Sequence, residues 1–252
     1  MDALIIAAGF GSRLVEVSPS KPLTPIAGVP LLELGVRQAA SAGARRVVVV
    51  TGHEADRVEA FLPGLAERAG IPVVAERIAD WSTPNGFSVM AGAARIASMG
   101  GSDFLLMMAD HIFAAPILQK LAQVGGPDRG VTLAVDTRIS SPLIDPDDAT
   151  WVQRGPGGLI VAIGKTIPQF DVVDCGAFLA TQELPRAIAQ AHAMGKPGSL
   201  SDGMQRLADA GRAATFDIGT DIDASWWMDV DDPRAHALAE AEAPLRLREI
   251  YG

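Results

Sequence analysis

Short apolar runs alternate with segments of helical periodicity through the first half of the chain. Each run is short and almost wholly apolar, which predicts a strand buried on both faces. These strands cover residues 3–7, 46–51, 71–75, 103–109 and 131–135. The intervening periodic segments predict helices over 31–43, 54–69 and a stretch ending near 98, and Pro63 should break or kink the second helix. This alternation indicates βαβ units and a mainly parallel sheet.

The second half of the chain contains more strands close together. A glycine turn at 155–158 separates two short apolar runs, which predicts a hairpin over 150–163. The remaining predicted elements are a strand at 172–179, helices at 182–194 and 199–210, a strand at 213–218 and a final helix at 233–243. No stretch resembles a linker, so we expect a single domain over residues 1–252.

The first predicted strand leads directly into a glycine-rich turn, Gly9-Phe10-Gly11-Ser12-Arg13. Glycines let backbone N–H groups approach an anionic ligand without interference from Cβ atoms. Arg13 and Lys21 add two positive charges, so the turn predicts a polyphosphate site. The Walker motif is absent, and Leu14 occupies the third small position of the dinucleotide fingerprint.

Carboxylates follow the strand at 103–109 and recur near the C-terminus. Asp110 lies at the carboxyl end of that strand, where burial is costly unless a carboxylate is paired or binds a metal. Asp229 and Asp231 point the same way if their segment is extended. Because hard cations prefer oxygen ligands, Asp110 and Asp229 are the candidate magnesium ligands. Asp231 remains open between metal binding and helix capping, and His111 between a site role and a loop hydrogen bond.

Three further loops have less specific patterns. The Asn85-Gly86 pair either caps the following helix or brings the backbone close to a ligand. Asp136 and Arg138 follow the fifth strand, and their position alone suggests the wall of a second-substrate pocket. The acidic loop at 142–148 is expected to be solvated surface.

Composition narrows the class of protein. A formal net charge of −9 argues against non-specific nucleic-acid binding, so an anion site must be a local basic pocket. The single cysteine, Cys175, excludes an intrachain disulfide and suits a reducing compartment. Neither a signal peptide nor a long apolar span is present. We therefore expect a soluble, cytoplasmic protein.

The opening motif, Ala7-Ala8-Gly9-Phe10-Gly11-Ser12-Arg13 followed by Lys21-Pro22-Leu23, resembles that of the sugar-phosphate nucleotidyltransferase family. The similarity extends over almost the whole chain. With the stretches at 85–88, 109–113, 162–176 and 227–231, the sequence is most similar to inositol-1-phosphate cytidylyltransferases. It departs from the usual pattern at Ala109, where a glycine or serine is more common.

This resemblance implies an α/β, Rossmann-like fold: a mixed, mainly parallel sheet flanked by helices, as in nucleotide-diphospho-sugar transferases. Residues 1–125 would mainly bind the NTP, and residues 126–252 would mainly bind the acceptor and carry the C-terminal helix. The implied reaction transfers CMP from CTP to a phosphorylated small molecule, inositol-1-phosphate, with Mg²⁺ and release of pyrophosphate. A sugar-1-phosphate, phosphocholine or phosphonate acceptor stays open, as does a non-catalytic NTP-binding regulator.

The resemblance also implies roles for particular residues. Arg13 would bind the triphosphate, Lys21 would neutralise charge at the α-phosphate and pyrophosphate, and Lys165 would grip the acceptor phosphate. Nucleotide-binding residues would be Ala7, Ala8, Gly9, Gly11, Ser12, Thr83, Asn85 and Gly86. Asp174 and Gly176 would contact the acceptor, and Asp110 and Asp229 would hold the metal. Small molecules, not nucleic acid, are the expected partners, and the sequence predicts no oligomeric state.

Overall fold

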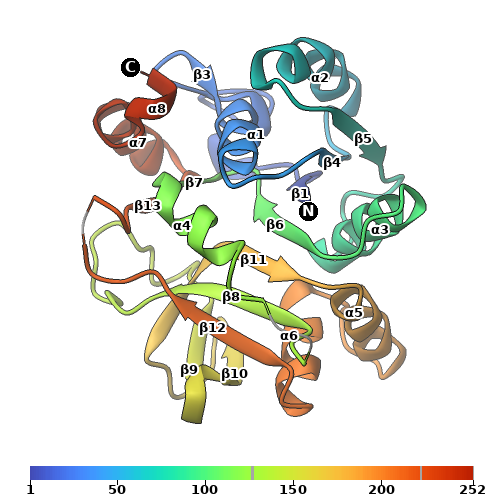
Figure 1. Ribbon diagram of the computed structural model, residues 1–252. Helices are drawn as coiled ribbons and strands as arrows, with labels where there is room; N and C mark the ends of the chain where they lie inside the picture. Colours follow the sequence, from blue (N-terminus) through green and yellow to red (C-terminus); the bar gives the residue numbers. More distant parts are fainter. Residues whose placement is uncertain (126–127, 222, 252) are drawn as a thin grey trace.

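In the computed structural model, residues 1–125, 128–221 and 223–251 are described, and a mixed sheet runs through the molecule (Figure 1). The strand order of the sheet is β10-β9-β11-β6-β1-β4-β5, with β8 paired to β11 and β12 paired to β8. Its strands, within the described ranges, are β1 (Asp2–Ala7), β4 (Val47–Thr51), β5 (Val73–Arg77), β6 (Phe104–Met108), β8 (Val131–Asp136), β9 (Trp151–Arg154), β10 (Ile160–Gly164), β11 (Val172–Ala180) and β12 (Ala213–Asp217).

Helices cover the sheet, and two short ribbons lie outside it. The helices are α1 (Leu31–Ser41), α2 (Ala55–Ala69), α3 (Asn85–Ser98), α4 (Ala115–Leu121), α5 (Glu183–Ala193), α6 (Leu200–Asp209), α7 (Pro233–Arg246) and α8 (Arg248–Tyr251). Short 3-10 turns are η1 (Ser12–Leu14), η2 (Lys21–Leu23) and η3 (Pro156–Gly158). The two ribbons pair β2 (Pro25–Ile26) with β3 (Val29–Pro30), and β7 (His111–Phe113) with β13 (Trp227–Asp229).

The N-terminal half of the sheet is parallel. β1 pairs with β4 on one side and with β6 on the other, and β5 continues beyond β4. In chain order, the sheet grows from β1 through β4 to β5 and then returns to β6, so the direction of growth reverses at β1. Open α/β sheets bind ligands outside the carboxyl ends of their strands at such a reversal. The glycine turn after β1 lies at this position.

The C-terminal half is mainly antiparallel and is joined to the first half by the long strand β11. β11 runs antiparallel to β6, β8 and β9, and β9 forms the predicted hairpin with β10. The register of β11 against β8 is irregular between Asp174 and Phe178, where Gly176 has a φ of 76°. This irregularity lies at the edge of the cavity described below.

Both faces of the sheet are buried, which accounts for the uninterrupted apolar runs in the sequence. Ile5, Val49 and Met107 face one core, whereas their neighbours Leu4 and Val48 face the other. Each of these side chains is fully buried. The predicted α/β fold with a mixed, mainly parallel sheet is therefore confirmed, and no linker divides the described chain.

Two expectations about local structure need correction. Helix α2 continues through Pro63 from Ala55 to Ala69. One lost backbone hydrogen bond is tolerated there because Val58, Leu62 and Leu65 remain buried on the inner face. The third strand lies at Val73–Arg77, slightly later than predicted. No helix in the part of the chain that the structure describes has both the length and the apolar composition needed to cross a membrane.

Candidate active site

The glycine turn brings Lys21 back against the end of β1. Gly11 has a left-handed φ of 62°, and a Cβ atom there would lie 2.6 Å from Cβ of Lys21. A side chain at position 11 would therefore be strained and would displace Lys21. Arg13 and Lys21 each lie within a short 3-10 turn, η1 and η2, in the segment that follows the carboxyl end of β1.

Lys21 and Asp110 form a largely buried ion pair. Nζ of Lys21 lies 2.5 Å from Oδ2 of Asp110, and the side chains are only 16% and 24% exposed. Burial opposes both charges, but the lysine and the neighbouring His111 hold the pKa of Asp110 well below its usual range. Asp110 and Asp229 raise the pKa of Lys21 despite its burial, so both partners are charged at neutral pH.

The β7–β13 ribbon places Asp229 beside Asp110. Asp229 lies directly opposite His111 in this ribbon, and the N–H of Val230 donates to the carbonyl of Asp110 at 2.9 Å. Nδ1 of His111 lies 2.7 Å from Oδ1 of Asp110 and 3.7 Å from Oδ1 of Asp229. Although burial disfavours the imidazolium, Asp229 and Asp110 raise the pKa of His111 to about 9. His111 thus connects the two carboxylates as a cation.

These carboxylates suit a divalent cation. Oxygens of Asp148, Asp229 and Asp231 lie within 4.8 Å of one another, and Asp110, His111 and Asp229 form a second such group. Oδ1 of Asp229 is buried without a hydrogen-bond partner, and burial raises the pKa of this carboxyl. An orphaned buried carboxylate oxygen beside further acids fits a hard metal ion such as Mg²⁺.

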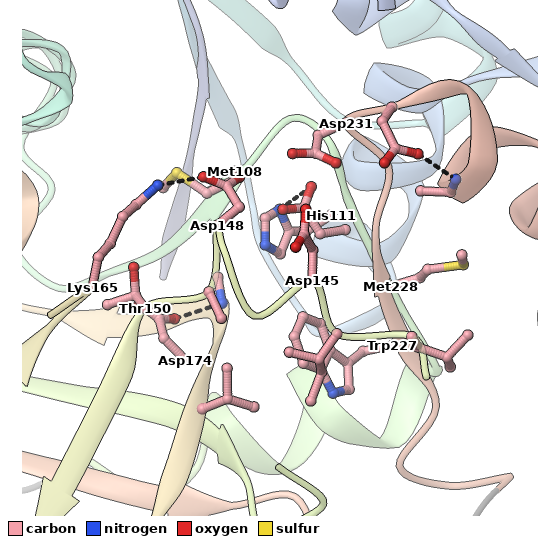
Figure 2. Close-up of a pocket in the computed structure, with 18 of the residues that line it drawn as sticks. Met108, His111, Asp145, Asp148, Thr150, Lys165, Asp174, Trp227, Met228 and Asp231 are labelled. Carbon is pink, nitrogen blue, oxygen red and sulfur yellow. Dashed lines mark hydrogen bonds and ion pairs between the residues drawn. The ribbon is translucent and has the colours of Figure 1, made fainter. Parts of the chain in front are cut away.

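A cavity of about 240 Å³ extends from these acids toward the second half of the sheet. Figure 2 shows Lys165, Asp148, Asp174, His111 and Asp231 around it, contributed by segments far apart in the sequence. Apolar side chains from Leu143, Ile144, Met228 and Leu238 complete its wall. The predicted acceptor residues Lys165, Asp174 and Gly176 therefore come together at one cavity.

The irregularity in β11 exposes Asp174 to the cavity. Its Oδ1 accepts a hydrogen bond from the N–H of Gly176 at 2.7 Å. A Cβ at Gly176 would lie 2.6 Å from Nε2 of His111, so only glycine permits this close approach. Burial raises the pKa of Asp174 to about 6, because its effect exceeds the opposing effects of the Gly176 N–H and of His111.

Replacing Asp174 with asparagine is expected to stabilise the fold near neutral pH. The native carboxyl must ionise at a pKa of about 6 instead of its ordinary value near 4, so the ionised form costs free energy only in the folded state. Asp174→Asn should therefore raise the unfolding free energy by up to about 3 kcal/mol at about pH 8, narrowing to about 1 kcal/mol near pH 4.5. Urea denaturation at both pH values measures this. A variant less stable than wild type at the higher pH would contradict it.

The acidic loop at 142–148 is not simply solvated surface. Asp145, Asp147 and the proline between them are exposed, but the loop also turns toward the cavity. Asp148 Oδ2 lies 2.5 Å from Nη2 of Arg13, and Asp148 Oδ1 pairs with Nζ of Lys165. Arg13 also pairs with Asp231. The carboxylate of Asp148 therefore bridges Arg13 and Lys165, the cations predicted to bind the donor and acceptor phosphates.

Asp148→Asn is expected to lower the KM for a phosphorylated substrate. Arg13 and Lys165 are about half exposed, and an exposed ion pair is worth at most about 1 kcal/mol, so removing the competing carboxylate should lower KM by up to about fivefold. Steady-state kinetics at low salt, where such pairs are strongest, measures this. A KM several-fold higher than wild type would instead mean that Asp148 positions the two cations for substrate.

The predicted nucleotide-binding residues lie at the end of β1 and around the start of α3, where Asn85 also lines the cavity. Ala7, Ala8, Gly9 and Ser12 lie at or just after the end of β1. Thr83 donates its hydroxyl to the carbonyl of Asp80 at 2.8 Å, and Oδ1 of Asn85 accepts from the N–H of Leu200 at 2.9 Å. Gly86 lies so close to the carbonyl of Gly198 that a Cβ there would clash. Their contact with a nucleotide remains a prediction.

The prediction that Asp136 and Arg138 line the pocket is wrong. Asp136 is 2% exposed, and its Oδ2 lies 2.7 Å from Nη2 of Arg138. The same oxygen accepts from Nε1 of Trp227 at 2.8 Å. Neither Asp136 nor Arg138 is among the described residues that line the cavity. They stabilise the β7–β13 ribbon through hydrogen bonds to Trp227 and to the carbonyl of Ser225.

Sequence reasoning did not find the β7–β13 ribbon or the role of Asp148. The ribbon has a weak signal, because His111-Ile112-Phe113 and Trp227-Met228-Asp229 are each too short for a clear alternating pattern. The position of Asp148 depends on its ion pairs with Arg13, 135 positions earlier in the chain, and with Lys165, 17 positions later. The residues around Asp148 carry no signal for either pair.

Comparisons with known proteins agree with this geometry. Residues 3–153 match a family model described as a MobA-like NTP transferase domain. The bifunctional IPC transferase and DIPP synthase of Rubrobacter xylanophilus is 34% identical over 241 residues, which cover 94% of this chain and 51% of that protein. A CMP-5'-(3-aminopropyl)phosphonate synthase from Streptomyces rubellomurinus is 29% identical over 92% of this chain and 37% of its own length. The chain thus spans about half, or less, of these relatives.

A solved structure shares the whole fold. The inositol-1-phosphate CTP transferase from T. maritima superposes with a TM-score of 0.79 at 24% identity, covering 98% of this chain and 96% of that one. The resemblance inferred from the opening motif is therefore confirmed. With more than half of its length matching the family model, the chain belongs to the MobA-like NTP transferase family.

Proposed function

We propose that this chain is a cytidylyltransferase that transfers CMP from CTP to the phosphate of inositol-1-phosphate and releases pyrophosphate. The observation that carries the proposal is the cluster of Lys21, Asp110 and Asp229 at the end of β1, directly beside a cavity that contains Lys165. The names of the Rubrobacter and T. maritima proteins support the choice of nucleotide and acceptor.

The chemistry needs no general base. An oxygen of the acceptor phosphate is already anionic, and it attacks the α-phosphorus of CTP while the bond to the β-phosphate oxygen breaks. Positioning and neutralisation of charge are therefore the main tasks of the site. Arg13 would bind the triphosphate, Lys21 would stabilise charge at the α-phosphate and the leaving pyrophosphate, and Lys165 would hold the acceptor phosphate.

Magnesium would be held by Asp110 and Asp229, with Asp231 as a further oxygen donor. When bound, it would supply additional positive charge to the donor phosphates. His111 and Lys21 already lie beside Asp110 and balance the negative charge of its carboxylate.

The acceptor side suits a polyol phosphate. Asp174 and Asp145 offer carboxylate oxygens to the cavity, and these accept hydrogen bonds from hydroxyl groups. The same acids would also attract an ammonium group, and the similarity to the aminopropylphosphonate enzyme supports such an acceptor as the second candidate. In both cases Lys165 faces the anionic phosphorus group.

Pyrophosphate release tests the donor and the acceptor together. CTP, UTP, GTP and ATP are each combined with Mg²⁺ and one of inositol-1-phosphate, phosphocholine, 3-aminopropylphosphonate or glucose-1-phosphate. We expect release with CTP and inositol-1-phosphate and little with other pairs. Release only with 3-aminopropylphosphonate would instead support the second candidate acceptor. No release with any pair, in a protein that still binds CTP, would support the non-catalytic regulator.

A further inference from the structure

Three aromatic rings that do not line the cavity gather at the glycine turn. Phe10, His53 and Trp81 follow the carboxyl ends of the adjacent parallel strands β1, β4 and β5. The ring centroids of Phe10 and His53 are 4.7 Å apart, those of His53 and Trp81 5.1 Å, and those of Phe10 and Trp81 5.9 Å. We call these three side chains the aromatic cluster.

The aromatic cluster is fixed at its base and open at its outer side. A Cβ at Gly52 would lie 2.7 Å from Cβ of Trp81, and the N–H of His53 donates to the carbonyl of Ala8 at 2.9 Å. The backbone therefore holds Trp81 closely against the ends of β1 and β4. Nevertheless Phe10 is 42% exposed and Trp81 41% exposed. Large aromatic side chains that are anchored yet exposed beside a ligand site suggest a binding surface.

The glycine turn lies between the charged groups and the two outer rings of this cluster, His53 and Trp81. Lys21, Asp110 and Asp229 lie toward β6, whereas His53 and Trp81 follow β4 and β5 on the opposite side of β1. A nucleoside triphosphate has the same division, with anionic phosphates at one end and a flat aromatic base at the other. A donor whose triphosphate follows the glycine turn would therefore direct its base toward the aromatic cluster.

We propose that the base of the donor nucleotide stacks on Trp81, with Phe10 and His53 holding the indole in place. This assignment rests on the proposed function, because it assumes that a nucleoside triphosphate is the donor. The hydroxyl of Thr83 is engaged by the carbonyl of Asp80 and Asn85 lines the cavity, whereas the rings of Phe10 and Trp81 are exposed on this side. Base–aromatic stacking contributes to affinity for every base, so Trp81 supplies affinity and polar groups must supply selectivity.

The test compares ligands with and without a base. Calorimetry measures the Kd of CTP and of inorganic tripolyphosphate, with Mg²⁺, for wild type, Trp81→Ala, Trp81→Phe and Phe10→Ala. We expect Trp81→Ala to weaken CTP by about 10- to 100-fold, with tripolyphosphate unchanged and partial recovery in Trp81→Phe. Phe170→Ala removes a similarly exposed ring, stacked on Trp151 in another loop, and is the matched control.

The outcomes separate this inference from the proposed function. If Trp81→Ala weakens CTP and tripolyphosphate equally, or weakens neither, the base does not stack on Trp81 and the inference is wrong, whatever the catalytic activity. If the base-dependent loss is seen but wild type releases no pyrophosphate with any acceptor, the inference stands and the proposed reaction fails. Thermal denaturation of each variant identifies a loss caused by unfolding, and Phe10→Ala then provides the same comparison.

Discussion

Replacing Lys21 with alanine is expected to lower kcat/KM by about 10²- to 10³-fold, the usual cost of losing one group that stabilises charge in a transition state. Lys21 is held against Asp110 beside the glycine turn, and under the proposed function its charge would stabilise the leaving pyrophosphate. Lys21→Ala also leaves the buried carboxylate of Asp110 without one of its partners, which should lower the melting temperature. Pyrophosphate release at saturating CTP, together with thermal denaturation, measures both effects.

Two controls separate these contributions. Lys120→Ala removes an exposed lysine on α4 and should leave both rate and stability unchanged. The double variant Lys21→Ala with Asp110→Asn removes the unpaired buried charge and should recover stability without recovering activity. Near-normal turnover in a folded Lys21→Ala protein would show that Lys21 does not stabilise charge in the transition state.

Asp229→Asn is expected to reduce kcat by at least about 10²-fold and to raise the Mg²⁺ concentration needed for half-maximal activity. Asp229 belongs to both groups of carboxylates, and its Oδ1 has no hydrogen-bond partner in the protein. Asparagine keeps the shape of the side chain and its place opposite His111 but removes the charge that attracts a cation. Pyrophosphate release is measured as a function of Mg²⁺ concentration.

The matched control is Asp209→Asn, an exposed carboxylate on α6, for which the Mg²⁺ dependence should not change. Partial recovery of Asp229→Asn at high Mg²⁺ would agree with a weakened metal ligand. An unchanged Mg²⁺ dependence, with activity reduced or not, would mean that Asp229 does not hold the metal.

Local patterns predicted the parts of the fold that depend on local physics. The apolar run of β1, the glycine turn that follows it and the alternation of β4, β5 and β6 with helices are all readable from neighbouring residues. The same patterns predicted that Asp110 follows the carboxyl end of a buried strand, and the structure shows this strand, β6, beside β1. The ion pair between Asp110 and Lys21 is seen only in the structure.

Other parts of the site depend on contacts between distant segments. Asp229 reaches Asp110 only through the β7–β13 ribbon, and Asp148 reaches Arg13 because a long loop turns back over the cavity. An acidic loop is usually solvated, and the cations that hold this one are remote in sequence. Asp136 misled the sequence analysis for the same reason, since its burial under Trp227 is not visible in the residues around it.

The aromatic cluster could not be predicted from the sequence for a different reason. Phe10, His53 and Trp81 each follow a different strand, and none of them has a specific motif. Only the strand order β1-β4-β5 brings the three rings together. Residues gathered by topology in this way are recognised in a structure, after the order of the strands is known.

The most direct test of the account is to identify the product formed from CTP, inositol-1-phosphate and Mg²⁺. Phosphorus NMR and mass spectrometry should show pyrophosphate and a product in which CMP and inositol-1-phosphate share a new P–O–P bridge, in equal amounts, with neither formed by Lys21→Ala. Unchanged CTP and inositol-1-phosphate, or hydrolysis of CTP without a bridged product, would contradict the assignment of this site to cytidylyl transfer onto inositol-1-phosphate.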